Sequence, residues 1–306
     1  MNTQYLDAAD GHRIALHQSL AEGKPAGVLV WLHGMAEHGA RYAALAQAAN
    51  AAGWHLYCPD HRGHGASVAD DELRGHFADT DGWARVLDDV ATVLANVQPQ
   101  HPRLPVVLGG HSMGSFIALA FAEQHGGRLD GLVLCGSDYK SPWLWKLARL
   151  PVALARWRRG PQGTSGLLRA LSFDAFARKI PHRRTDFDWL SRDAAEVDRY
   201  INDPWCGHDC TTQLWHDLIN AMVQVDSLAA MKQLPVSVPV LLIGGDSDPM
   251  SGMGKGMPAL YRALHRAGIA DLTFGQFTGG RHEILNDLCR EEVHEEIVAW
   301  LKQHYA

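Results

Sequence analysis

The sequence has few of the features that mark specialised classes of protein. Its 306 residues contain only five cysteines, an odd number scattered along the chain. This argues against the disulfide framework that holds small secreted domains together. No apolar run approaches the roughly 20 residues of a membrane-spanning helix. The first residues, MNTQYLDAADGHR, also lack the basic and apolar regions of a secretory signal peptide, so we expect a cytoplasmic protein.

What is present is the pattern of an α/β protein. Six short apolar runs are typical of buried strands, at residues 28–32, 54–58, 105–109, 129–136, 238–245 and 271–277. Between them, helical spacing of apolar residues recurs at 40–52, 81–97, 113–124, 258–267 and 287–303. This alternation predicts a doubly wound, mostly parallel sheet covered on both faces. Apolar stretches around the Asp10-Gly11 turn predict an initial hairpin.

The alternation breaks once, between residues 137 and 235, where no convincing strand is present and six tryptophans occur. An insertion after the carboxyl end of a strand lies above the sheet edge at which α/β proteins bind ligands. We therefore divide the chain into a core, residues 1–136 and 236–306, and a helical cap, or lid, at 137–235.

The cap begins with a basic stretch that is also aromatic. Residues 137–184 contain 11 Lys and Arg against two acids, so they carry +9 while the rest of the chain carries −15. Pro142 and Pro151 predict that residues 137–159 form short helices at most. The apolar side chains there can simply pack on the core and leave the basic ones in solvent. Alternatively, they form the mouth of an acyl-chain site, with a basic rim that makes peripheral contact with anionic membranes.

A serine stands between glycines in Gly110-His111-Ser112-Met113-Gly114, after an apolar run and before a helical pattern. By itself this is consistent with a turn or a helix cap. At a sharp strand-to-helix turn, however, Ser112 would be strained with its hydroxyl exposed, and the glycines would let helix and strand approach closely. N–H groups at the helix N-terminus would face a developing negative charge. We therefore predict that Ser112 is a nucleophile.

A serine nucleophile needs a base, and the base needs a group that orients it. In this architecture the chain order is Ser, acid, His. His282 lies in a Gly-rich loop between the last strand and the last helix, which makes it the predicted base. His265 and His294 fall within helical patterns, and we expect both at the surface.

Three acids fit the position of the orienting group. Asp246 and Asp248 follow the predicted strand at 238–245, and Asp138 follows the predicted strand before it. One of the first two can serve only to initiate a turn, since Asp before Pro commonly does so. Spacing alone does not separate the three.

An oxyanion intermediate needs two preorganised N–H donors. Met113, directly after the predicted nucleophile, supplies one, and Met35, in the loop after the strand at 28–32, supplies the other. The alternative for this loop is a helix start in which Glu37 and Arg41 form a surface pair four residues apart.

Two other patterns suggest different sites. Cys206, His208 and Cys210 are metal-ligand types, but their spacing fits no standard zinc set and no fourth ligand is evident. The glycine-rich stretch HRGHG at 61–65 lacks the Lys-Ser/Thr ending of a phosphate loop. We interpret the first as a loop without metal and the second as a turn.

Five motifs in order resemble one family: HGMAEHGARY, PDHRGHGAS, GHSMG, GGDSDP and GGRHE. Together they look like the α/β-hydrolase fold of the monoacylglycerol lipase and lysophospholipase-like group, of serine aminopeptidase S33 type. The resemblance covers about two-thirds of the chain and implies a Ser112–Asp248–His282 triad with Met35 and Met113 as oxyanion donors. It favours Asp248 because the acid of this family is the last Asp of its motif.

The sequence departs from the family in two respects. Ser115 stands where many relatives have a further glycine, which should matter little beyond the turn. The cap resembles the family only in its placement and its aromatic content.

We therefore predict a serine hydrolase that cleaves acyl esters, such as monoacylglycerol- or lysophospholipid-like ones, through an acyl-enzyme. No cofactor, metal or nucleic-acid partner is expected. The alternatives are an aminopeptidase on the same fold, against which the basic cap argues, and a non-catalytic acyl-ligand binder. A binder of this kind usually lacks a triad member.

Overall fold

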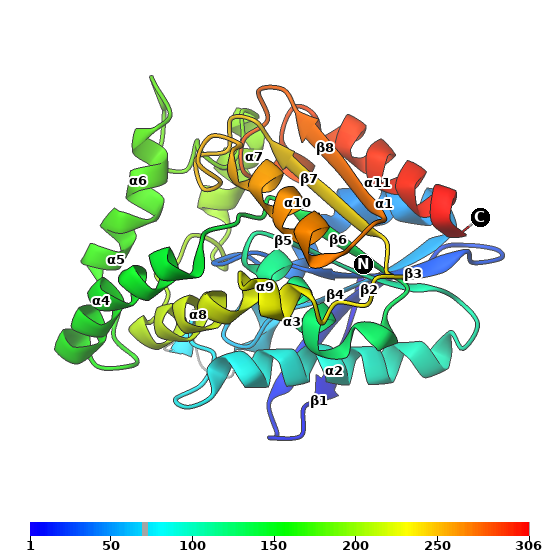
Figure 1. Cartoon of the computed structure of the whole chain (residues 1–306), viewed down its shortest axis with the longest axis horizontal. Coiled ribbons are helices and arrows are strands. Elements are labelled where there is room, and N and C mark those ends of the chain that lie inside the picture. The colour runs from blue at the N-terminus through cyan, green and yellow to red at the C-terminus, as the bar shows by residue number, and fades with distance from the viewer. Residues whose placement is uncertain (69–72, 306) are drawn as a thin grey trace.

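The computed structural model describes residues 1–68 and 73–305, which form a sheet between layers of helices (Figure 1). Within these residues, eight strands lie in the order β1-β2-β4-β3-β5-β6-β7-β8. The strands are β1 (Asn2–Asp7), β2 (Arg13–Ser19), β3 (Gly27–Leu32), β4 (Trp54–Pro59), β5 (Val106–His111), β6 (Gly131–Cys135), β7 (Val240–Gly245) and β8 (Leu272–Phe277). The β1–β2 hairpin and the β2–β4 pair are antiparallel, and the other pairs are parallel. The predicted α/β-hydrolase architecture is confirmed.

Helices cover both faces of the sheet because the central strands are apolar along their length. Every residue of β3, β4, β5, β6 and β7 is buried. The helices that follow strands of the core are α1 (Ala43–Ala51), α2 (Gly82–Gln100), α3 (Met113–His125), α10 (Gly256–Ala267) and α11 (Arg290–Tyr305). α1 and α11 pack on one face, and α2, α3 and α10 pack on the other.

A helical segment is inserted between β6 and β7, and we call residues 137–235 the cap segment. Its helices are α4 (Pro142–Arg159), α5 (Gly166–Leu171), α6 (Phe173–Arg178), α7 (Ala194–Asn202), α8 (Thr212–Val225) and α9 (Leu228–Met231). In Figure 1, α4, α5 and α6 project to the left, beyond the ends of the strands. α8 joins the apolar layer of α2 and α3, so the cap segment is anchored on the core.

The first helix of the cap segment differs from its sequence prediction. α4 is one continuous helix with Pro142 in its first turn and Pro151 inside it, so the expected division into short helices is wrong. Pro151 has no N–H to donate to the carbonyl of Leu147, four residues earlier. Leu147 is exposed, so water can hydrate that carbonyl and the helix continues.

The two helical histidines have different surroundings. His265 on α10 is exposed, as expected. His294 on α11 is buried, so its expected surface position is wrong. It lies on the side of α11 that packs against the turn at Ile284–Asn286, and burial lowers its pKa to about 4. In the described parts of the chain, no helix has both the length and the apolar character needed to cross a membrane.

Candidate active site

Ser112 occupies a strained turn between β5 and α3. Its φ is 52° and its ψ is −120°, a backbone conformation that costs energy in any residue other than glycine. A Cβ on Gly110 would come within 2.3 Å of the carbonyl oxygen of Gly114, and a Cβ on Gly114 within 2.2 Å of that of Leu32. The two glycines therefore let helix, turn and neighbouring strand meet, as the sequence predicts.

His282 and Asp248 meet Ser112 at the carboxyl edge of the sheet. The Nε2 atom of His282 lies 2.9 Å from the Oγ of Ser112. The Nδ1 atom of the same ring lies 3.1 Å from the Oδ2 of Asp248. The structure thus brings together three residues that are up to 170 positions apart in the sequence. This is the arrangement of nucleophile, base and orienting acid in serine hydrolases.

The three candidate acids have distinct surroundings. Asp248 is 1% exposed, and its other oxygen accepts the N–H of Met250 at 2.8 Å. Although burial opposes ionisation, His282 and this N–H hold the pKa of Asp248 below its usual range. Asp246 instead accepts the N–H of Gly279 at 2.7 Å within the turn. Asp138 contacts the ammonium group of Lys140. Of these acids, only Asp248 has a hydrogen bond with His282.

The two predicted oxyanion donors border the same cavity as Ser112. Met113 is the first residue of α3, and the first N–H groups of a helix have no intrahelical acceptor. Met35 lines the cavity from the loop after β3, beside Ala36, whose φ is 56°. Ser115, at the unusual position, donates its hydroxyl to the carbonyl of Ser112 at 2.6 Å. Its side chain therefore supports the turn itself.

A buried charge network lies beneath the site, and sequence analysis did not identify it. The guanidinium of Arg41 donates to Glu37 at 2.6 Å and to both oxygens of Glu283 at 2.7 and 2.6 Å. The interpretation of Glu37 and Arg41 as a surface pair is therefore wrong. Both side chains are nearly buried, because Arg41 packs against Glu283 in the loop of His282. Arg41 and Glu283 lie 242 positions apart in the sequence, so no local pattern indicates their contact.

The network joins the loops that carry the site. Glu37 also accepts the N–H of Gly34 at 2.6 Å and the hydroxyl of Tyr42 at 2.8 Å. His111, next to Ser112, lies 3.3 Å from Glu37 and donates its Nε2–H to the carbonyl of His282 at 3.1 Å. Burial opposes ionisation of Glu37, but Arg41 and His111 hold its pKa well below the usual range. The carboxylate therefore ties the Met35 loop, the turn and the His282 loop together.

The cap segment closes over this edge of the sheet. The ring of Trp189 stacks on that of His282, with centroids 5.0 Å apart. The next residue, Leu190, accepts the N–H of Glu283 through its carbonyl at 2.7 Å. A cavity of about 660 Å³ extends from Ser112 between core and cap. Its apolar wall includes Trp145, Val152, Leu168, Phe173, Phe176 and Trp215.

The chain is similar to known proteins over nearly its whole length. A family profile described as "Serine aminopeptidase, S33" matches residues 23–289. Monoacylglycerol lipase from Mycolicibacterium smegmatis is 28% identical over 299 residues, which cover 96% of this chain and 94% of that protein. Human monoglyceride lipase is 28% identical over 306 residues, 99% of this chain and 91% of that protein.

Solved structures give the same result. A thermostable carboxyl esterase from Bacillus coagulans, in complex with glycerol, has a TM-score of 0.91 and 29% identity. The match covers 100% of this chain and 99% of the esterase. The matched regions contain the sheet, the Ser112 turn, the cap segment and the His282 loop. This chain therefore belongs to the serine aminopeptidase S33 family and is an α/β-hydrolase of the monoacylglycerol-lipase-like group.

Proposed function

We propose that this carboxylic ester hydrolase cleaves monoacylglycerol-like esters through an acyl-enzyme formed on Ser112. One observation carries the proposal. The Ser112 hydroxyl, hydrogen-bonded to His282 and through it to Asp248, lies at the base of a cavity with a largely apolar wall. A nucleophile and its base supply the chemistry, and the apolar wall supplies an environment for an acyl chain.

The proposed reaction follows from this geometry. Nε2 of His282 takes the hydroxyl proton as Oγ of Ser112 attacks the ester carbonyl, and Asp248 holds the ring in the required tautomer. The N–H groups of Met35 and Met113 stabilise the oxyanion. His282 then protonates the leaving alcohol. A water, activated by the same ring, releases the acid. A small cavity of about 30 Å³ beside Ser112 and His282 is large enough for such a water.

The size of the main cavity supports a substrate with one acyl chain. Its volume of about 660 Å³ lies within the range of pockets that enclose one small ligand. Asp138, Lys140, Lys179 and Lys255 line part of the same space. These three ammonium groups argue against an aminopeptidase, whose substrates present an ammonium group of their own.

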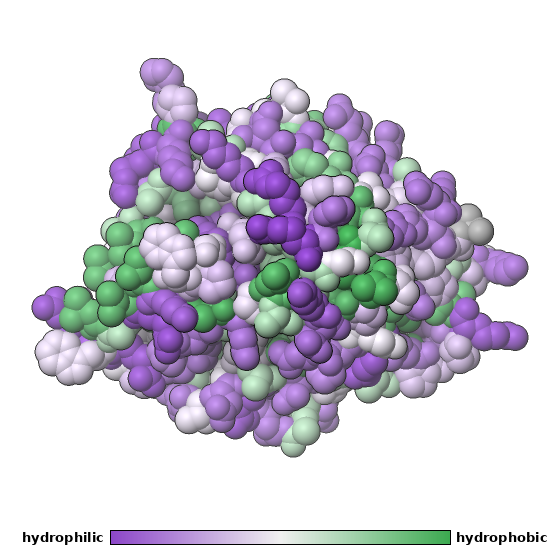
Figure 2. All heavy atoms as spheres, in the orientation of Figure 1, coloured by the Kyte–Doolittle hydropathy of each residue, from purple (hydrophilic) through white to green (hydrophobic). Residues whose placement is uncertain are grey.

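We also propose that the cap segment contacts anionic membrane surfaces. On α4, the side chains of Trp157, Leu150 and Trp143 are 80%, 67% and 59% exposed. Figure 2 shows apolar side chains gathered at the end of the molecule where Figure 1 places α4 and α5. Exposed Lys and Arg side chains lie among them. Aromatic and aliphatic groups with a basic rim are the features of a surface that lies on lipid headgroups.

Substrate profiling tests the main proposal. Hydrolysis of monoacylglycerols and p-nitrophenyl esters of graded chain length should rise from short to long chains until the cavity is filled. Diacylglycerols and aminoacyl anilides should be poor substrates. Intact mass measurement during rapid turnover should detect one acyl group on Ser112. Preference for an aminoacyl anilide would instead favour the aminopeptidase, and no turnover with any ester would favour a binder.

Co-sedimentation tests the membrane contact. The protein should bind vesicles that contain phosphatidylglycerol more strongly than vesicles of phosphatidylcholine alone. The difference should shrink as salt is added, because ions screen the attraction between exposed charges. Binding that ignores both lipid charge and salt would contradict this role and leave α4 as a wall of the pocket.

A further inference from the structure

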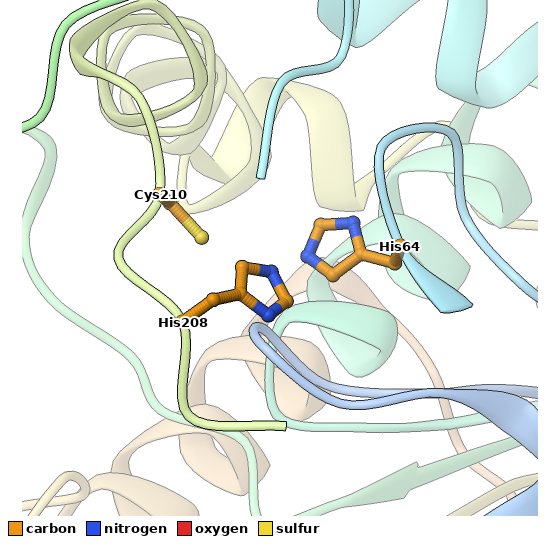
Figure 3. A group of neighbouring side chains, drawn as sticks. All are labelled: His64, His208 and Cys210. Carbon is orange, nitrogen blue, oxygen red and sulfur yellow. The ribbon is translucent and has the colours of Figure 1, made fainter. Parts of the chain in front are cut away.

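Three side chains that can bind a metal meet between the core and the cap segment. His64 lies in the turn after β4, whereas His208 and Cys210 lie in the loop before α8 (Figure 3). One ligand atom from each residue lies within 4.8 Å of the other two. Figure 3 shows nitrogens of the two rings facing each other and the sulfur of Cys210 directed at the ring of His208. The cluster is distinct from the catalytic residues.

The polar atoms of this cluster have few partners. His64 is fully buried, and its Nδ1 lies 3.2 Å from the carbonyl of Arg62. Its Nε2 has no hydrogen-bond partner within the described residues. The ring of His208 has no side-chain partner there and contacts only the backbone of Trp205. Buried polar atoms in native proteins almost always have a partner, because an unpaired one is destabilising. The unpaired, buried Nε2 of His64, with ligand atoms of His208 and Cys210 close by, therefore requires an explanation.

The residue types and their placement suit a cation. Ring nitrogens of His64 and His208 face each other, and the sulfur of Cys210 is directed at the same point (Figure 3). A divalent cation would replace the thiol proton of Cys210 and neutralise the buried thiolate. Two imidazoles and a thiolate are ligands that zinc prefers.

We propose that His64, His208 and Cys210 bind one Zn²⁺ ion, with water or another small ligand in the fourth position. The ligand atoms already lie within 4.8 Å of one another, a spacing that one ion with bonds of about 2.0–2.3 Å can bridge with small side-chain adjustments. His208 is only half-buried, so its loop borders the surface and gives the ion an entry path. The bound ion would link the turn after β4 to the cap segment and stabilise their contact.

A second group of ligand types lies nearby and is a weaker candidate. His38, Asp203 and Cys206 also bring ligand atoms within 4.8 Å of one another. Here, however, Nε2 of His38 already donates to Asp203 at 2.9 Å, so the histidine and the acid satisfy each other. The cluster at His64 has no comparable internal pairing.

Metal binding by the full-length protein tests the site directly. After removal of metals with a chelator, titration with Zn²⁺ should show one site and the release of about one proton per ion, from the Cys210 thiol. Co²⁺ should give the near-ultraviolet charge-transfer band of a thiolate ligand. Zn²⁺ should raise the Tm by several degrees, because a ligand that binds only the folded state stabilises it.

Variants separate this site from the alternatives. His208→Ala and Cys210→Ser should each weaken Zn²⁺ binding at least tenfold, and Cys210→Ser should abolish the cobalt–thiolate band. Cys206→Ser, and His182→Ala at an exposed histidine of the cap segment, should behave like wild type. Metal-free circular dichroism and ester hydrolysis check that each variant is folded. Absence of a thiolate band in the wild type, or its loss in Cys206→Ser but not in Cys210→Ser, would overturn the proposal.

Discussion

The strands of the core and helix α4 of the cap segment differ in how far their apolar side chains are buried. In the core, β3 to β7 bury every residue between two layers of helices. In the cap segment, α4 buries only Val152 and Ala155 and exposes Trp143, Leu150 and Trp157. A close-packed interior holds groups in fixed positions, which a strained serine and its base require. The exposed apolar face of α4 holds no group of the site in place, and this fits the proposed contact with lipid.

The two regions also differ in charge. The cap segment has 14 Lys and Arg against 11 acids and carries +3, whereas the core carries −9. The positive charge is concentrated in residues 137–184, which carry +9. Charges in the core that lie near the site are paired and buried, as in the contact of Arg41 with Glu37 and Glu283. Many of the basic side chains on α4 are exposed. The comparison links the proposed chemistry to the packed region and the proposed membrane contact to the exposed, basic helix.

Removal of the nucleophile should produce the largest effect. Ser112→Ala should lower kcat for every ester by on the order of 10⁶-fold, the loss seen when a serine protease loses its nucleophile. Stability should be retained, since alanine removes only a hydroxyl. Steady-state kinetics and the Tm measure the two quantities. A fluorophosphonate probe should label wild type and not the variant. Labelling of the variant, or of a different serine in wild type, would remove Ser112 from the role.

Replacement of the orienting acid, Asp248, should have the second-largest effect on activity. Asp248→Asn should lower kcat by about 10⁴-fold, because the amide no longer fixes the tautomer of His282. Asp246→Asn is the matched control, two residues away in the same loop, and should cost less than tenfold. Comparable losses in both variants would show that the loop as a whole, rather than the hydrogen bond to His282, is responsible.

A buried acid of the core should show an effect on stability. Glu123 on α3 is 8% exposed, its Oε1 has no hydrogen-bond partner in the part of the chain described, and burial beside Asp226 raises its pKa to about 9. Between pH 4.5 and 9 the unfolded chain loses this proton while the folded chain keeps it, so stability falls as pH rises. Glu123→Gln should remove this fall and raise the free energy of unfolding at pH 7 by about 3 kcal/mol.

Urea unfolding at a series of pH values measures this difference. Wild type and Glu123→Gln should have similar stabilities near pH 4.5 and diverge as the pH increases. Parallel pH profiles would show that Glu123 is ionised in the folded protein. Because Gln has nearly the same shape, packing alone would not produce a divergence that depends on pH.

Charge reversal on the cap segment should have the smallest effect. Lys146→Glu with Arg158→Glu should weaken binding to anionic vesicles and reduce long-chain turnover on them by less than about tenfold, while leaving a short soluble ester unchanged. Both side chains are exposed, whereas Arg156 donates to Gln213 and serves packing. Arg262→Glu with Arg266→Glu on α10 makes the same charge change in the core and should be neutral. Equal losses in the two pairs would indicate that only net charge matters.

The sequence alone determined the fold and most of the candidate site. Strand and helix periodicity reflects which side chains must be buried, so the alternation and the Gly110–Gly114 turn could be read locally. The position of His282 followed because a loop between a strand and a helix has its own local signature. The role of Asp248 rested on resemblance to a family, since Asp246 has the same local environment in sequence.

Only the tertiary structure decided which distant side chains meet. Arg41 and Glu37 have the spacing of a surface pair, and only packing under Glu283 makes them a buried network. Cys206, His208 and Cys210 fit no standard metal set in the sequence, and only the structure brings His64, more than a hundred residues away, beside His208 and Cys210. The reason is physical. Local periodicity specifies which face of an element is buried, whereas a contact between elements depends on how whole layers pack, which no single segment encodes.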